Sequence, residues 1–223
     1  MKKILGMLTL ITLLQTYPSF AQEQSTETIP VTSSEYIQKV VDYKLMNNFS
    51  DGQFYPDKLI SRAELASILV KAFNLDKRLI NQQEQSIFVP DVPISNSAYQ
   101  DIQIVLKTEI MKGYRGNMFF PNQKVTRAEG LAIFAQAYGV FQFSDDTVNE
   151  ILTPYPDAKN IPDWARKAIA TVITEGFVNT DTQGNIYPLR PMTRGDLAYV
   201  LSKYLQRQQK QPEMPIVPEV PSF

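Results

Sequence analysis

The sequence predicts a mainly α-helical protein built from three copies of one helical-pair repeat. A short polar motif occurs three times in the 223 residues, as SRAE at Ser61–Glu64, TRAE at Thr126–Glu129 and TRGD at Thr193–Asp196. Apolar residues with helical spacing precede and follow each copy at matching distances from its arginine. Because a single helical pair cannot bury both of its apolar faces, the three copies are expected to share one core.

The first helix of each repeat is predicted from four apolar positions, which lie 25, 22, 21 and 17 residues before the motif arginine. This spacing of i, i+3, i+4 and i+8 is the apolar stripe of an amphipathic helix of about four turns. The residues at these positions are Ile37, Val40, Val41 and Leu45, then Ile102, Val105, Leu106 and Ile110, then Ile169, Val172, Ile173 and Phe177.

A turn is expected between the two helices of each repeat. A polar, glycine-bearing stretch leads to an aromatic-proline step at Tyr55-Pro56, Phe120-Pro121 and Tyr187-Pro188, six residues before the arginine. Proline prevents a simple continuation of the first helix. The third stretch, Asn179–Arg190, imitates a calcium-binding loop but ends on arginine where a bidentate glutamate is required. We therefore expect a turn there, and no metal or cofactor anywhere in the chain.

The motif itself predicts the start of the second helix. Ser or Thr followed three residues later by Glu or Asp, just before an apolar run, is a capping box. Capping explains the first and fourth letters of the motif but not the arginine, since the helix dipole opposes a cation in the first turn. Two explanations stay open, namely a structural pair with a nearby carboxylate or contact with a ligand. The apolar residues of this helix are Leu65, Ala66, Ile68, Leu69 and Phe73, then Leu131, Ile133, Phe134 and Tyr138, then Leu197, Ala198, Val200 and Leu201.

The two ends of the chain differ from the repeats. Residues 1–21 have the features of a secretory signal peptide, with Lys2 and Lys3 before an apolar stretch at Ile4–Leu14 and a small-x-small cleavage site at Ser19-Phe20-Ala21. That stretch is too short to anchor the protein in a bilayer, and no later segment is long and apolar enough to do so. Residues 22–30 are expected to be a disordered lead, and residues 207–223 an extended proline-rich tail. We therefore expect an exported protein that is peripheral at the cell wall, in the periplasm or on the cell surface.

Composition excludes several classes of function. The chain contains no cysteine and no histidine, so disulfides, Ser-His-Asp catalysis and the usual zinc ligands are absent. A net charge of −1 argues against a nucleic-acid partner, which requires a basic surface. A carbohydrate hydrolase would need two carboxylates facing one cleft, for example Asp91 with Glu129. The acids recur at turn and cap positions, however, where backbone geometry explains them, and we expect no enzymatic activity.

The three blocks resemble S-layer homology motifs, in which an aromatic-Asp lead, a Trp-Ala helix start and a glycine-bearing turn precede Phe-x-Pro and Thr-Arg-Ala-Glu. The resemblance covers residues 31–206 and places the repeats at 31–75, 88–140 and 155–206. The residues that carry it are Asp51-Gly52, Phe54, Pro56 and Ser61–Glu64 in the first repeat, Phe88, Asp91, Gly113-Tyr114, Phe120-Pro121 and Thr126–Glu129 in the second, and Tyr155-Pro156-Asp157, Trp164-Ala165, Gly176, Tyr187-Pro188 and Thr193-Arg194 in the third.

The resemblance implies a pseudo-threefold helical bundle that binds cell-wall polysaccharide non-covalently and tethers its protein to the envelope. In the best-understood members the ligand is a pyruvylated sugar held in grooves between neighbouring repeats. Thr32 and Ser97 occupy the tryptophan position in the first two repeats, so at most one groove is expected to be complete. The alternative is a helical-repeat module that recruits another envelope protein. Carried over by position, the predicted glycan contacts are Arg62, Arg127, Arg194, Trp164, Asp91 and Asp157.

Overall fold

The computed structural model describes residues 34–79 and 85–210, and this part of the chain is mainly helical and contains no β-sheet. The predicted signal peptide (1–21) and disordered lead (22–30) lie outside the described residues, as do Thr32 and residues 211–223 of the predicted tail. Within the described residues, no helix is both long enough and apolar enough to cross a membrane.

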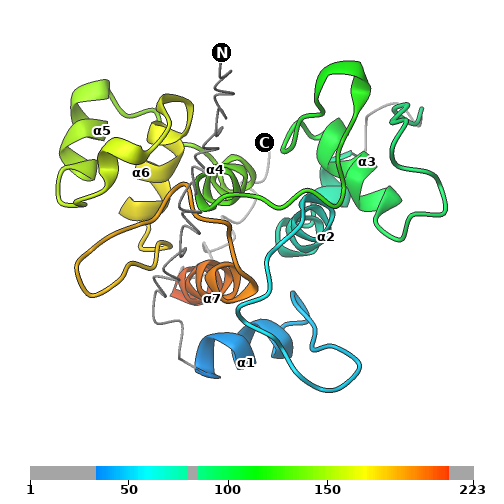
Figure 1. Ribbon diagram of the computed structural model, residues 1–223, viewed down its shortest axis with the longest axis horizontal. Coiled ribbons are helices and arrows are strands. Elements are labelled where there is room, and N and C mark those ends of the chain that lie inside the picture. Colours follow the sequence, from blue (N-terminus) through cyan, green and yellow to red (C-terminus); the bar gives the residue numbers. More distant parts are fainter. Residues whose placement is uncertain (1–33, 80–84, 211–223) are drawn as a thin grey trace, which may run out of the picture.

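Each repeat contributes one outer and one inner helix, which confirms the predicted helical-pair architecture. The three inner helices lie side by side around the middle of the molecule, and the outer helices surround them (Figure 1). The outer helices are α1 (Ser34–Asp42), α3 (Tyr99–Lys107) and α6 (Arg166–Thr174), and the inner helices are α2 (Arg62–Phe73), α4 (Arg127–Tyr138) and α7 (Arg194–Lys210).

The outer helices are shorter than the four turns that the sequence predicts. Each ends just before a residue in the left-handed conformation, namely Lys44 (φ 57°), Glu109 (φ 56°) and Gly176 (φ 73°). The chain then folds back, so that an amide one or two residues later donates to a valine carbonyl of the helix. The last predicted apolar position of each stripe therefore follows the helix instead of belonging to it. These residues, Leu45, Ile110 and Phe177, are nevertheless buried.

One further helix was not predicted. Helix α5 (Asp145–Leu152) occupies the connector between the second and third repeats, and Ser144 caps it by accepting a hydrogen bond from Thr147 N. Its buried residues, Val148 and Leu152, pack on the common core beside α6. Short 3₁₀ turns complete the connections at Leu75–Leu79, Arg115–Asn117, Ala158–Asn160 and Asp163–Ala165.

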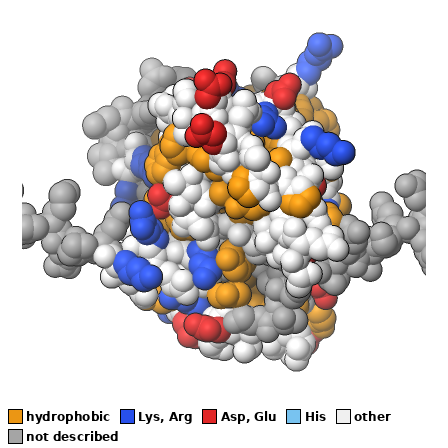
Figure 2. Space-filling view, turned by 90° about the vertical axis from the view of Figure 1, so that its left-hand side faces the viewer, with side chains coloured by type: hydrophobic (Ala, Val, Ile, Leu, Met, Phe, Trp, Pro, Cys, Tyr) orange, Lys and Arg blue, Asp and Glu red, His pale blue; other side chains and the backbone are white. Residues whose placement is uncertain are grey.

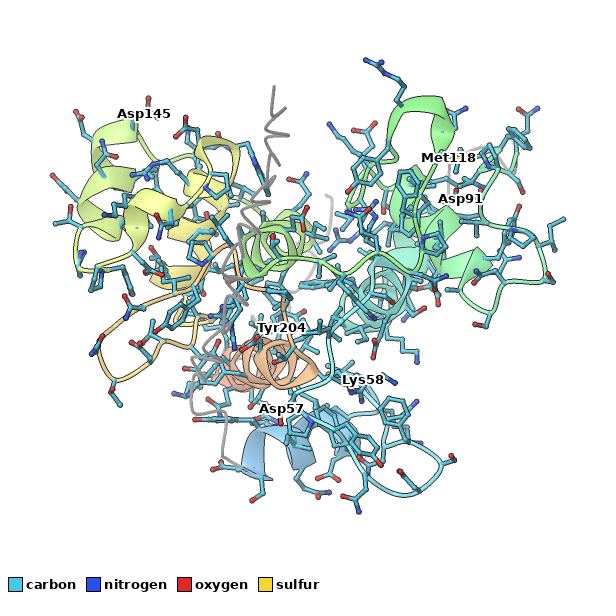
Figure 3. All side chains as sticks on the ribbon, viewed as in Figure 1. Asp57, Lys58, Asp91, Met118, Asp145 and Tyr204 are labelled. Atoms are coloured by element: carbon cyan, nitrogen blue, oxygen red, sulfur yellow. The ribbon has the colours of Figure 1, made fainter. Side chains whose placement is uncertain are left out.

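A single core lies between the three inner helices. Phe73 of α2, Phe134 of α4 and Tyr204 of α7 contact one another with ring centroids 4.8–5.9 Å apart, and Figure 3 shows Tyr204 in the middle of the bundle. Aromatic residues on or beside helical apolar faces are buried by default, which predicts a core position for Tyr36, Tyr43, Phe73, Tyr99 and Tyr138. Phe73 is buried, while the expectation is wrong for Tyr43, whose side chain follows the end of α1 and is 50% exposed. The other three, Tyr36, Tyr99 and Tyr138, are half-buried.

A closed ring of three backbone hydrogen bonds joins the repeats just before their inner helices. Ile60 N donates to Met192 O (3.0 Å), Met192 N to Val125 O (2.8 Å) and Val125 N to Ile60 O (3.3 Å). All three residues are buried. Each repeat thus contacts both of the others, and the first repeat is as close to the third as to the second.

Candidate functional site

The motif arginines lie in the joints between repeats. Arg62 leaves the start of α2 and reaches the second repeat, where its Nε donates to Phe119 O (2.7 Å) and its Nη2 to Lys112 O (2.8 Å). The guanidinium group of each motif arginine makes the same two bonds with the next repeat around the bundle, which for Arg194 is the first repeat. The corresponding acceptors are the carbonyls of Ile186 and Asn179 for Arg127, and those of Phe54 and Asn47 for Arg194.

The amino ends of the inner helices are also used within the fold. In α2, Arg62 N donates to Gln123 O (2.9 Å) and Ala63 N to Pro121 O (3.0 Å), so the aromatic-proline turn of the next repeat covers the helix end. The third amide, Glu64 N, donates to Ser61 Oγ (3.2 Å). Helices α4 and α7 repeat this arrangement. These amides bind the protein itself and are not available to an external anion.

Asp91 and Asp157, two of the predicted glycan contacts, hold the aromatic-proline turns. Asp91, which precedes α3, accepts hydrogen bonds from Phe119 N (2.9 Å) and Phe120 N (2.6 Å) in the turn that follows α3, and Figure 3 shows it near Met118 of that turn. Asp157 accepts from Ile186 N (2.9 Å) and Tyr187 N (2.6 Å) in the same way. Phe120 (φ 55°) and Tyr187 (φ 54°) have left-handed backbones, which L-residues rarely adopt without such support. Direct contact of either carboxylate with a ligand stays a prediction.

The third guanidinium nitrogen, Nη1, distinguishes the three joints. Arg127 Nη1 pairs with Asp196 (2.8 Å), and both side chains are fully buried. Arg194 Nη1 pairs with Glu64, the acid at the same position of the first repeat. For these two arginines the structure shows the pair with a carboxylate that the sequence analysis left open. Whether any of the three arginines contacts a ligand stays a prediction.

Arg62 has no such pair among the described residues. The corresponding acid is Glu129, which instead reaches back to accept from Thr126 N (2.7 Å) and Thr126 Oγ1 (3.1 Å) and so completes a capping box. Within the part of the chain that the structure describes, Arg62 Nη1 has neither a hydrogen-bond partner nor a carboxylate in ion-pair range. One of the three joints therefore contains a guanidinium group with an unused edge.

Arg62 lines a cleft of about 690 Å³ between the second and third repeats. The walls are the loop after α3, the outward face of α4 and the segment that leads into α6. Trp164, in the 3₁₀ turn before α6, lines the same cleft with 64% of its surface exposed. The charged residues of the cleft are Arg62, Lys112 and Lys167, with Glu109 and Glu129. The structure thus brings two of the six predicted site residues, Arg62 and Trp164, into one cleft.

The position of the Arg62 guanidinium is fixed on several sides. Its carbon lies 4.8 Å from the ring centre of Tyr114 and 4.5 Å from that of Phe119, while two of its nitrogens bind carbonyls. The residue is 6% exposed, and this burial lowers the pKa of Arg62 below its ordinary value. Guanidinium nevertheless remains protonated in proteins. The result is a rigid, partly desolvated cation at the edge of an open cleft.

The corresponding cleft between the first and second repeats has different contents. Its volume is about 450 Å³, and it is lined by Glu64, Ser67 and the segment before α3. Ser97 stands at the position of Trp164, as the sequence alignment of the repeats predicts. Glu64, which lines this cleft, pairs with Arg194 of the third repeat. This second cleft therefore has neither an indole nor an unpaired guanidinium edge.

Some residues of the joints were missed by the sequence analysis. Asp196 pairs with Arg127 and also with Arg190 (2.9 Å), while Asn179 Oδ1 accepts a further bond from Arg127 (3.1 Å). The change from RAE to RGD marked the third motif as different, but nothing in the motif identified Arg190 or Asn179 as partners. The distribution of charged side chains on the surface did not point to a further site in a comparable way. On the face where α5 and α6 lie, acidic and basic side chains are interspersed with apolar ones (Figure 2).

Comparison with known proteins supports the repeat assignment. The family model described as S-layer homology domain matches residues 29–66, 90–129 and 154–198. The chain is 27% identical over 199 residues to a Surface-layer 125 kDa protein of Lysinibacillus sphaericus, and 26% identical over 176 residues to an Amylopullulanase of Thermoanaerobacterium thermosulfurigenes. It is 32% identical over 97 residues to a Cellulosome-anchoring protein of Acetivibrio thermocellus.

These matches cover very different shares of the proteins compared. They include 88%, 78% and 44% of this chain, but only 16%, 9% and 21% of the three relatives. The similarity is therefore to one part of much longer proteins.

Proposed function

The chain belongs to the S-layer homology domain family, and from this premise we propose that it is a non-catalytic module that attaches to the cell envelope by binding cell-wall polysaccharide. The proposed site is the cleft between the second and third repeats that contains Arg62 and Trp164. The proposed location is peripheral, at the cell wall or cell surface, after export.

The relatives support attachment more than catalysis. Two of their names refer to a surface layer and to anchoring, whereas the name of the third is that of an enzyme of which the match covers 9%. The two acids that a hydrolase could use, Asp91 and Glu129, both accept backbone hydrogen bonds within turns and caps. Their positions are explained by the fold, so we propose no reaction.

The single observation that carries the proposal is that Arg62, with its unused edge, and the exposed indole of Trp164 line the same cleft. A carboxylate, such as that of a pyruvyl ketal on a sugar, would accept a charge-assisted hydrogen bond from Nη1. The flat face of Trp164 would cover the C–H face of the sugar ring, and the indole N–H could donate to a hydroxyl. Lys112 and Lys167 add positive charge to the same cleft. We propose a pyruvylated or otherwise carboxylated glycan as the ligand.

The other predicted site residues receive a different role in this proposal. Arg127 and Arg194 are 0% and 5% exposed and bind the neighbouring repeat. Asp91 holds the turn that receives Arg62, and Asp157 holds the turn that receives Arg127. We propose that these four act as positioning residues, which keep the loops around the cleft in place.

A sedimentation assay with purified cell-wall sacculi tests the proposal. Wild-type protein should co-sediment with the sacculi. Trp164→Ala should reduce binding by roughly tenfold or more, because the variant loses the contact between the indole and the sugar and the apolar area that this contact buries. The matched control is Leu189→Ala, which removes a similarly exposed apolar side chain (61%) outside the cleft. Equal binding of Trp164→Ala and wild type would show that the cleft is not the site.

The alternative, a module that recruits another envelope protein, is favoured by the exposed apolar residues before α3. Ile87, Phe88 and Ile94 are 38%, 75% and 81% exposed. Sacculi freed of protein by protease should retain the chain if it binds glycan, and should lose it if it binds a protein. Sacculi treated with mild acid, which removes acid-labile wall polysaccharide, should lose the chain if it binds glycan and should retain it if it binds a protein.

A further inference from the structure

Each inner helix has an acidic residue at its third position, and the bonds made by this residue are not the same in the three repeats. Glu64 in α2 pairs with Arg194, and no bond joins it to the backbone of its own cap, Ser61, within the described residues. Asp196 in α7 does both, since it accepts from Thr193 N (2.9 Å) and pairs with Arg127. Among the described residues, the carboxylate of Glu129 in α4 is bonded only to its own cap.

From this difference we infer that these acids determine which joint can bind an external anion, so that the chain has one anion site, at Arg62, and the acids of the other two joints occupy theirs. The inference rests on the proposed function, because it concerns the carboxylate group of the same glycan ligand. It adds the number of sites, their location and the residues that select between them.

An internal carboxylate excludes an external one for two reasons. Nε and Nη2 already bind the carbonyls of the neighbouring repeat, and the internal carboxylate at Nη1 occupies the remaining edge and neutralises the charge that would attract an external anion. The internal acid is also held beside its partner by the fold, so it needs no association step, whereas a free ligand loses translational and rotational freedom on binding. A ligand therefore competes poorly for Arg194 and Arg127.

The Arg127 joint is closed more completely than the Arg194 joint. Arg127 and Asp196 are both fully buried, and Arg190 and Asn179 complete the contacts there. Glu64 is more accessible, with 27% of its side chain exposed, and it lines the smaller cleft between the first two repeats. Removal of Glu64 should therefore open that cleft to Arg194 Nη1, while Arg127 stays inaccessible.

At the open joint, Arg62 is already arranged for a ligand. Two carbonyls and two aromatic rings hold the guanidinium group, so little order remains to be imposed when an anion binds. Glu129 lies in the same cleft but is held by the Thr126 cap. The site is thus a guanidinium edge in a fixed orientation.

Isothermal titration calorimetry on the chain with a defined probe tests the inference. The probe is a methyl glycoside that bears a pyruvate ketal, and its uncharged methyl ester serves as the control ligand. Wild type should bind one equivalent of the acid and bind the ester at least tenfold more weakly. Glu64→Ala should bind two equivalents, because Arg194 Nη1 becomes available. The Ser61 cap of α2 is retained in this variant, so the helix should still form.

Two further variants separate the new site from the old one. Asp76→Ala removes one negative charge from an exposed residue away from the joints, and it should keep the stoichiometry of one. The double variant Arg62→Gln/Glu64→Ala should also bind one equivalent, now at Arg194. A melting curve of each variant shows whether it is folded before its stoichiometry is compared.

The outcomes distinguish the inference from the proposed function. One equivalent for wild type and two for Glu64→Ala support the inference. One equivalent for both proteins overturns it and leaves the proposed function intact, as do two or three equivalents for wild type. No binding of the acid by wild type overturns the carboxylated glycan as the ligand and the inference with it.

Discussion

Arg194 Nε donates a hydrogen bond to Phe54 O at 3.0 Å, although 140 residues separate the two in the sequence. The bond joins the third repeat to the first in the same way as Arg62 joins the first to the second. The three repeats therefore form a closed ring, in contrast to a solenoid, whose terminal repeats have only one neighbour. Because every joint depends on a buried guanidinium group, loss of one joint should weaken the whole bundle.

Arg127→Met should destabilise the protein more than the loss of a surface charge would. The variant removes one of the two cations that pair with the buried Asp196 and also the donor to the Ile186 and Asn179 carbonyls. Breaking a buried ion pair on one side costs about 3–5 kcal/mol, and because Arg190 still pairs with Asp196 we expect the low end of that range. Urea denaturation followed by circular dichroism measures the difference. The exposed Lys71→Ala should change the free energy of unfolding by less than about 0.5 kcal/mol. A loss below about 1 kcal/mol for Arg127→Met would argue against a supporting role for the pair.

The sequence predicted the inner helices, their caps and the common core, because these depend on local spacing and on three copies in register. It could not predict the partner of each acid. SRAE and TRAE are nearly the same string, yet Glu64 pairs with a guanidinium group and Glu129 with its own cap. That choice is made by residues of another repeat, far away in the sequence. The length of the outer helices was missed for a similar reason, since Lys44 and Glu109 adopt left-handed backbones without being glycine.

Gly130→Ala tests the close contact between α4 and the strand-like segment before α7. A methyl group at this position would lie 2.2 Å from Met192 Sδ, and Met192 is fully buried. Alanine favours the helix by about 1 kcal/mol, but overpacking costs about 1–3 kcal/mol, so we expect a lower free energy of unfolding. Combining the change with Met192→Ala should recover part of that loss, because the two residues are in contact. A more stable Gly130→Ala variant would mean that the segment moves aside freely.

Tyr138→Phe should reduce the loss of stability at alkaline pH. Burial, together with a hydrogen bond to Glu175 (2.8 Å), raises the pKa of Tyr138 to about 12. The unfolded chain has an ordinary tyrosine pKa of about 10. The folded state therefore favours the neutral phenol, and its contribution is fully present below about pH 10 and is lost as the pH rises through about 12.

Urea denaturation at several pH values between about 9 and 12 measures this effect. The free energy of unfolding of wild type should fall more steeply over that range than that of Tyr138→Phe. Tyr43→Phe, which changes an exposed phenol, is the control and should follow wild type. Parallel curves for all three proteins would show that Tyr138 ionises equally in the folded and unfolded states.

Arg62→Lys and Arg194→Lys form a matched pair that separates binding from folding. Each substitution keeps the charge but removes the planar fork that binds two carbonyls, so both should destabilise the bundle to a similar extent. Of the three motif arginines, Arg62 alone lacks a carboxylate partner within the described residues, and it lines the larger cleft. Binding to sacculi should therefore fall roughly tenfold or more for Arg62→Lys, which corresponds to at least about 1.4 kcal/mol. Arg194→Lys should bind nearly as wild type at a temperature where both variants are folded. Equal losses of binding would mean that the arginines act only by holding the ring together, because both substitutions remove the same two carbonyl bonds.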